Sequence, residues 1–181
     1  MSESQQSVLS FWFEESGPSR WFQKDDDFDQ EVAERFGKLT RRAAACELWQ
    51  WRRDPRGRLA EVIVLDQFSR NIFRDTPQAF AQDPLALALA QEAVALGADR
   101  DMSPMERAFL YMPYMHSESP RIHEVALELY DELGLEEQYD FELRHKEIID
   151  RFGRYPHRNA ILGRESSPEE QDFLEQPGSG F

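Results

Sequence analysis

Helix start and stop signals recur along this chain, and they constrain its fold more than any other feature. Ser-Pro-Met-Glu at residues 103–106 and Ser-Pro-Glu-Glu at residues 167–170 each combine an N-cap serine, a proline at the first helical position and a glutamate placed for a capping box. Asp-Pro at residues 83–84 and Ser-Pro at residues 119–120 open two further helices. Gly97, Gly134 and Gly153 stand at positions where a glycine commonly ends a helix. The signals predict helices over residues 84–96, 103–116, 120–133 and 136–152.

The rest of the chain also has helical patterning. We expect a short helix over residues 7–15, a longer one from the acidic turn at residues 25–27 to about residue 45, and another that begins near Gly57. The only β-like run, at residues 62–64, lies inside a longer apolar pattern of helical length. Short connections favour antiparallel neighbours. The sequence therefore predicts an all-α fold of about eight antiparallel helices.

Length and charge restrict the class of protein. The 181 residues fit a single domain, with a core over about residues 7–176 and a short tail at residues 177–181, whose terminal Phe181 we expect to fold back. An excess of 35 acidic over 21 basic residues gives a net charge of −14, which argues against nucleic acid or a membrane surface as partner. The lone Cys46, the absence of a signal-peptide pattern and the lack of an apolar run of about 20 residues predict a cytoplasmic protein.

Charged residues interrupt the most apolar stretch of the chain. Asp66 and Arg70 fall on the apolar stripe of the helix that contains residues 59–73, and their spacing of four lets them pair. Asn71 and Arg74 lie on the adjoining stripe. This pattern is typical of a structural ion pair, or of the polar floor of a pocket.

A second interruption lies near the C-terminal end. His145 stands in the middle of an apolar stripe, where it is either a core histidine or a catalytic one. The following segment, residues 151–164, is rich in groups that bind carboxylate or phosphate: Arg154, His157, Arg158, Asn159 and Arg164. A third polar group, His116 with Glu118, follows the buried helix at residues 103–116.

Two basic segments stand out in this acidic chain. Residues 52–74 and residues 141–164 each contain six basic and three acidic residues. Such segments are candidates for facing one another around a small anion. Ion pairing with acidic helices is the alternative.

The standard catalytic motifs are absent from the sequence. There is no glycine-rich phosphate loop, no Gly-x-Ser-x-Gly and no zinc-type cluster. Glu142 and His145 have the Glu-x-x-His spacing of di-iron bundles, but only one good copy exists and basic residues follow it. We therefore expect no metal and no cofactor.

Several motifs taken together resemble one family across nearly the whole chain. They are Phe-Trp-Phe at residues 11–13, Trp-Phe at 21–22, Leu-Asp-Gln-Phe-Ser-Arg-Asn-Ile-Phe-Arg at 65–74, Tyr-Met-Pro at 111–113, His-Ser-Glu at 116–118 and Arg-Phe-Gly-Arg-Tyr-Pro-His-Arg-Asn at 151–159. The chain resembles the bacterial domain-of-unknown-function family nine-twenty-four. The resemblance implies a tetratricopeptide-like, α-solenoid-like helical fold, and it implies no catalytic residues.

Three functional hypotheses follow. In the first, the protein binds a small carboxylate or phosphate and carries out acid–base chemistry on it. The candidate catalytic residues are His145, His157, Asp66 and Glu118, and the candidate ligand-binding residues are Arg70, Asn71, Arg74, His116, Arg154, Arg158, Asn159 and Arg164. In the second, the helical array is a scaffold that binds a protein or peptide. In the third, these polar residues only satisfy one another within the core.

Overall fold

The computed structural model describes residues 4–180, and every regular element within them is helical. This confirms the all-α prediction, and the number of helices is close to the eight expected. The N-terminal half contains α1 (Gln5–Leu9), a π-helical segment (Ser10–Ser16), α2 (Pro18–Trp21), α3 (Asp26–Ala44), a 3-10 turn (Trp49–Arg53), α4 (Pro55–Ile63), a π-helical turn (Val64–Phe68) and α5 (Ser69–Ile72).

The C-terminal half follows the predicted start and stop signals closely. It contains a 3-10 turn (Pro77–Ala79), α6 (Asp83–Ala95), a 3-10 turn (Ala98–Asp101), α7 (Pro104–Met115), α8 (Pro120–Leu133), α9 (Glu136–Phe152), a 3-10 turn (Pro156–Arg158) and α10 (Pro168–Leu174). The serines at positions 103 and 167 form the predicted capping boxes with Glu106 and Glu170. Gly153, with φ 68°, adopts the left-handed conformation that ends α9.

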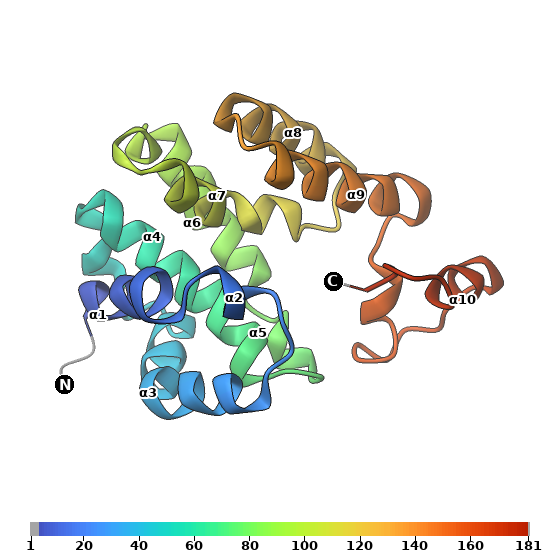
Figure 1. The fold of residues 1–181 in the computed structure, drawn as a ribbon, viewed down its shortest axis with the longest axis horizontal. Helices are drawn as coiled ribbons and strands as arrows, with labels where there is room; N and C mark the ends of the chain where they lie inside the picture. Colours follow the sequence, from blue (N-terminus) through green and yellow to red (C-terminus); the bar gives the residue numbers. More distant parts are fainter. Residues whose placement is uncertain (1–3, 181) are drawn as a thin grey trace.

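Neighbouring helices pack against one another in chain order. α8 packs against both α7 and α9, and the three helices lie together in the upper part of Figure 1. α4 contacts α6 and α7, which joins the two halves. The C-terminal segment with α10 leaves the end of α9 and lies at one side of the structure (Figure 1). The tetratricopeptide-like arrangement and the single domain stay predictions, and Phe181 lies outside the described residues.

Apolar side chains form two clusters in the described part of the chain. The larger draws on elements from α1 to α8 and has an aromatic centre in which Trp12 makes edge contacts with Phe68 and Phe109. The smaller joins Ile148 and Ile149 of α9 to Tyr155. Within residues 4–180, no helix is both long and apolar enough to cross a membrane.

Candidate functional site

Asp66 is the centre of a buried polar cluster. It lies in the π-helical turn between α4 and α5, and it is 1% exposed. A π-helical turn shifts the register of side chains along a helix, and such turns are frequent at functional sites. Oδ1 of Asp66 lies 2.8 Å from Nδ1 of His116, at the end of α7, and Oδ2 accepts a hydrogen bond of 2.6 Å from Nε2 of Gln67. The π-helical turn therefore holds an aspartate–histidine pair in the protein interior.

Arg70 links this pair to a second carboxylate. Its Nη1 donates to Oδ1 of Asp66 at 3.1 Å, which confirms the predicted pairing over one helical turn. The same guanidinium makes a bidentate contact with Asp83, at 2.9 and 3.0 Å. Asp83 is the first residue of α6, and sequence reasoning treated it only as part of a helix start. Its acidic character at a helix N-terminus gave no sign that two arginines converge on it.

Arg158 is the second of those arginines, and it is only partly satisfied. Its Nη1 donates to Oδ2 of Asp83 at 3.3 Å, and its Nη2 donates to the backbone oxygen of His116 at 3.0 Å. The rings of Phe80 and Tyr155 each have their centroid 4.6 Å from the guanidinium carbon. Nε is buried and has no hydrogen-bond partner among the described residues. Arg158 is thus a buried cation with few acceptors.

A row of rings extends from His116 to the C-terminal loop. Ring centroids lie 6.4 Å apart for His116 and His145, 5.8 Å for His145 and Tyr155, and 5.6 Å for Tyr155 and His157. Nδ1 of His145 donates to the backbone oxygen of Phe141 at 2.7 Å, because a carbonyl only accepts. The basic lone pair of His145 is therefore on Nε2. The end of α7, helix α9 and the C-terminal loop thus bring these rings together.

Burial sets the protonation states in this cluster. Burial lowers the pKa of His145 to about 3 and that of His157 to about 4, and it also lowers the pKa of His116. Burial alone raises the pKa of Asp66, but the charge of Arg70 and the hydrogen bond with His116 outweigh it and hold that pKa below its ordinary value. At neutral pH the aspartate is ionised and the three histidines are neutral.

The pKa of Arg158 is shifted in the opposite direction from the pKa values of the other arginines whose values are shifted. Burial and the charge of Arg70 lower the pKa of Arg158. Ion pairs with carboxylates raise the pKa values of Arg35, Arg52, Arg70, Arg74 and Arg154. Among these arginines, Arg158 is therefore the one whose positive charge is least compensated by its surroundings.

Other predicted ligand-binding residues form separate contacts. Nδ2 of Asn71 donates to Oδ1 of Asp29 at 2.7 Å, and Arg74 makes an ion pair with the same carboxylate. Arg154 makes a bidentate pair with Glu170, at 2.7 and 2.8 Å. The structure does not bring these side chains into the contacts around Asp66.

Glu118 and Arg164 hold the C-terminal loop against the rest of the protein. Arg164 contacts the two carboxylate oxygens of Glu118 at 2.7 and 2.9 Å. Oε1 of Glu118 also accepts a hydrogen bond of 2.8 Å from the backbone nitrogen of Tyr155. Nε of Arg164 donates to Oδ1 of Asn159 at 2.9 Å. These contacts position the loop that carries His157 and Arg158.

The Glu-x-x-His motif has a different partner from the one its spacing suggests. Oε1 of Glu142 lies 2.6 Å from Nδ1 of His123, and both side chains are fully buried. Nε2 of His123 lies 2.8 Å from the backbone oxygen of Ser117. Sequence reasoning did not single out His123. Within residues 4–180, no group of three or more His, Cys, Asp or Glu side chains is arranged to hold a metal ion.

A pocket of about 410 Å³ borders the polar cluster. It is lined by Pro77, Phe80, Ala81, Asp83, Pro84, Leu87, Pro113, His116, Ser117, Glu118, Arg158 and Leu162. These residues come from helices α6 and α7 and from three loops. His116 and Arg158 are therefore both among the residues that line this pocket.

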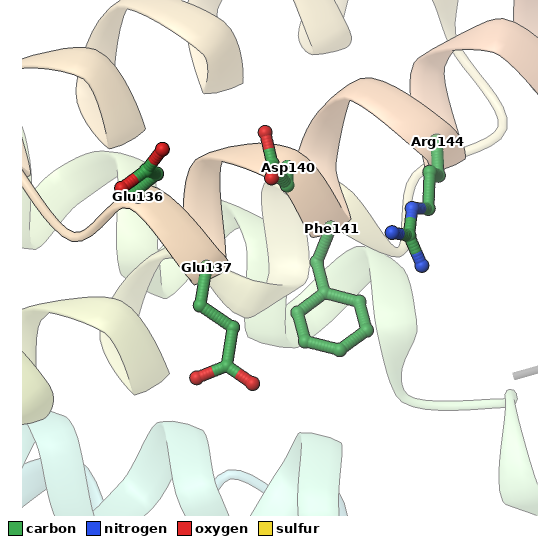
Figure 2. A pocket seen from close by; sticks show the side chains of 5 residues that line it. All are labelled: Glu136, Glu137, Asp140, Phe141 and Arg144. Carbon is green, nitrogen blue, oxygen red and sulfur yellow. The ribbon is translucent and has the colours of Figure 1, made fainter.

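A second pocket of similar volume lies on α9 alone. Figure 2 shows Glu137, Phe141 and Arg144 pointing to one side of this helix, with Glu136 and Asp140 pointing to another. Its lining comes from a single helix and is mostly acidic. It lacks the convergence of several elements that the first pocket has, so we place the candidate site at the first.

The comparisons with known proteins relate this chain to proteins of unknown function. The model of a family described as bacterial protein of unknown function (DUF924) matches residues 8–178. A solved structure, that of the protein of unknown function ATU0120 from Agrobacterium tumefaciens, is 40% identical, with a TM-score of 0.90 over 94% of this chain and 96% of that chain. None of the curated proteins matches.

Proposed function

This chain belongs to the DUF924 family of bacterial proteins of unknown function, and from its own site we propose that it binds a small anionic molecule at Arg158 and transfers a proton with His116. The observation that carries the proposal is the state of Arg158. It is 6% exposed, it shares Asp83 with Arg70, and it lies directly beside the Asp66–His116 pair. A buried, undercompensated guanidinium attracts a carboxylate or phosphate oxygen.

His116 is placed to act as the base. Asp66 is ionised, so the proton shared between Oδ1 and Nδ1 belongs to the imidazole, and Nε2 carries the lone pair. The lowered pKa of His116 keeps the ring neutral at pH 7, as a general base requires. Its side chain lines the pocket. Asp66 orients the ring, in the way that a carboxylate orients the histidine of other acid–base pairs.

The net charge of the site limits the ways in which an anion can bind to it. Asp66 and Asp83 already balance Arg70 and Arg158 while the histidines are neutral. An anion therefore binds with uptake of about one proton, or it competes with Asp83 for Arg158. The contact of Arg158 with Asp83 is the longest in the cluster, at 3.3 Å, which favours competition at this arginine.

A thermal-shift titration tests the proposal. Acetate, succinate and phosphate are the probes, and a ligand at 100 times its Kd stabilises a protein by about 2.7 kcal/mol. We expect at least one anion to raise the Tm by roughly 5–10 °C in the wild type. The Arg158→Gln variant should lose this shift, and Arg154→Gln is the matched control because its partner Glu170 lies on α10. Equal shifts in both variants would refute a site at Arg158.

The scaffold hypothesis makes the opposite prediction for the same proteins. Phe22, Trp49 and Leu96 are among the exposed large apolar side chains, and side chains of this kind are where a protein partner would dock. If the protein is a scaffold, anions leave its Tm unchanged, and one partner protein is captured stoichiometrically by wild type and by Arg158→Gln alike.

A further inference from the structure

The residues that line the pocket next to Arg158 fall into two chemical sets, which we call the polar wall and the apolar wall. The polar wall consists of Asp83, His116, Ser117, Glu118 and Arg158. The apolar wall consists of Pro77, Phe80, Pro84, Leu87, Pro113 and Leu162. A ligand that fills this volume therefore meets charged groups from the first set and carbon from the second.

The polar wall limits the charge that the ligand can carry. Glu118 is engaged by Arg164 and by the backbone nitrogen of Tyr155, so it contributes an acceptor and no donor. Asp83 is shared by two guanidinium groups. Two carboxylates beside one partly satisfied arginine disfavour a dianion such as phosphate, because the second negative charge has no cation to meet. One negative charge fits this wall best.

The apolar wall limits the rest of the ligand. Proline, leucine and phenylalanine side chains offer no hydrogen bonds to hydroxyl groups, so a sugar or a nucleoside would lose its contacts with water there without compensation. A hydrocarbon body gains free energy at the same surface. The volume of about 410 Å³ lies within the range of small-molecule pockets.

We propose that the ligand of this site is a hydrophobic monocarboxylic acid, with its carboxylate at Arg158 and its hydrocarbon body between Phe80, Leu87 and Leu162. The proposal rests on the proposed function, since it names the class of anion that Arg158 takes. His116 then lies beside the carboxylate end of the molecule, because its backbone oxygen accepts from Arg158 and it lines the same pocket.

A homologous series measures the contribution of the apolar wall. The Kd values of acetate, butanoate, hexanoate and octanoate are measured by calorimetry with the full chain. Each buried methylene contributes about 0.8 kcal/mol, or about a fourfold change in Kd. We expect the Kd to fall by roughly 15-fold for every two added methylenes until the pocket is full. Hexanol, which has the same body without the charge, should bind far more weakly than hexanoate.

Two variants measure separately what the polar wall and the apolar wall contribute to the affinity for carboxylates. Arg158→Gln should weaken every carboxylate of the series to a similar degree. Leu162→Ala should flatten the dependence on chain length and leave acetate unchanged, and Leu162 is 36% exposed, so the fold tolerates its truncation. Arg154→Gln again serves as the control.

The possible results distinguish this proposal from the more general one. A Kd that does not depend on chain length, or phosphate binding at Arg158 as tightly as octanoate, would overturn the hydrophobic ligand and leave anion binding intact. Equal binding of hexanol and hexanoate would overturn the role of the carboxylate. Failure of every anion to bind would overturn both proposals.

Discussion

Arg158 donates to the carboxylate of Asp83 across 75 positions of sequence, at 3.3 Å, and the same carboxylate accepts both terminal nitrogens of Arg70. The two basic segments of the chain therefore do meet around an anion, and that anion is a side chain of the protein. Arg70 receives the shorter contacts and a second carboxylate, Asp66. Arg158 has the longer contact with Asp83 and no second carboxylate partner, and this asymmetry is why we propose Arg158 as the ligand-binding residue.

The Asp83→Asn variant should lose stability and gain anion affinity. Removing one partner of a buried ion pair costs about 3 kcal/mol because the remaining charge is uncompensated, and here two guanidinium groups lose their partner. The same loss should strengthen anion binding at Arg158. Urea unfolding measures the first effect, and the rise of Tm with added acetate measures the second.

Asp29→Asn provides the comparison for this experiment. Asp29 is also paired with an arginine, Arg74, but it makes no contact with the cluster. Its replacement should lower stability without increasing the response to acetate. An Asp83→Asn protein whose Tm responds to acetate no more than the wild type would show that Asp83 does not compete with ligands for Arg158.

Replacement of Asp66 should change the tautomer of His116. The Asp66 carboxylate accepts from Nδ1, so the wild-type ring carries its proton on Nδ1. In Asp66→Asn this acceptor is weakened, and we expect a mixture of tautomers. We also expect a loss of stability of about 3 kcal/mol, because Arg70 keeps its pair with Asp83 but loses its second carboxylate partner. Nitrogen NMR of the histidine ring reads the tautomer directly. An unchanged Nδ1–H tautomer in the variant would remove the role that we assign to Asp66.

Much of the fold could be predicted from sequence because its signals are local. Ser-Pro pairs and glycines placed the ends of α7, α8 and α9 within one residue of those observed. The Asp66–Arg70 contact was also predictable, since it spans one helical turn. The predicted helix near Gly57 begins at Pro55 and passes into a π-helical turn, for which the sequence carries no distinct signal.

The partners of the polar residues were not predictable in the same way. His116 was among the candidate ligand-binding residues, yet its contact with Asp66 spans 50 positions of sequence and was not predicted. Asp83 and His123 were overlooked, because an aspartate before a proline and a histidine in a helix both have ordinary local explanations. Which carboxylate meets which arginine depends on how α6, α7 and the C-terminal loop pack, and a helical period does not encode it.

Stability should fall as the pH drops from 7.5 to 5.5. Histidine in an unfolded chain has a pKa of about 6.5, whereas burial lowers the pKa of His145 to about 3 and of His157 to about 4. The folded state therefore resists protonation. The stability from these neutral rings is complete above pH 6.5 and is lost as the pH falls toward the native pKa values. Each ring contributes a loss of about 1.4 kcal/mol over this interval.

The His157→Gln variant isolates one of these contributions. Glutamine does not titrate, so the difference in unfolding free energy between pH 7.5 and 5.5 should shrink by about 1.4 kcal/mol. His116, with its pKa lowered by burial, acts in the same direction, and Glu142, with its pKa raised by burial, acts in the opposite direction. Both are present in the variant and the wild type, so they cancel. Parallel pH profiles for the two proteins would contradict a neutral, buried His157.

Glu118→Gln should loosen the loop that carries Arg158 without unfolding the helices. The carboxylate makes two contacts with Arg164 and one with the backbone nitrogen of Tyr155, and a neutral amide cannot reproduce all three. We expect a loss of stability of about 1–2 kcal/mol and faster hydrogen exchange at residues 155–164. Because a mobile Arg158 binds less tightly, the affinity for hexanoate should fall severalfold as well. Arg151→Gln, which removes an exposed pair with Glu169, should change neither quantity. If exchange at residues 155–164 stays slow in Glu118→Gln, other contacts hold the loop, and the position of Arg158 does not depend on this ion pair.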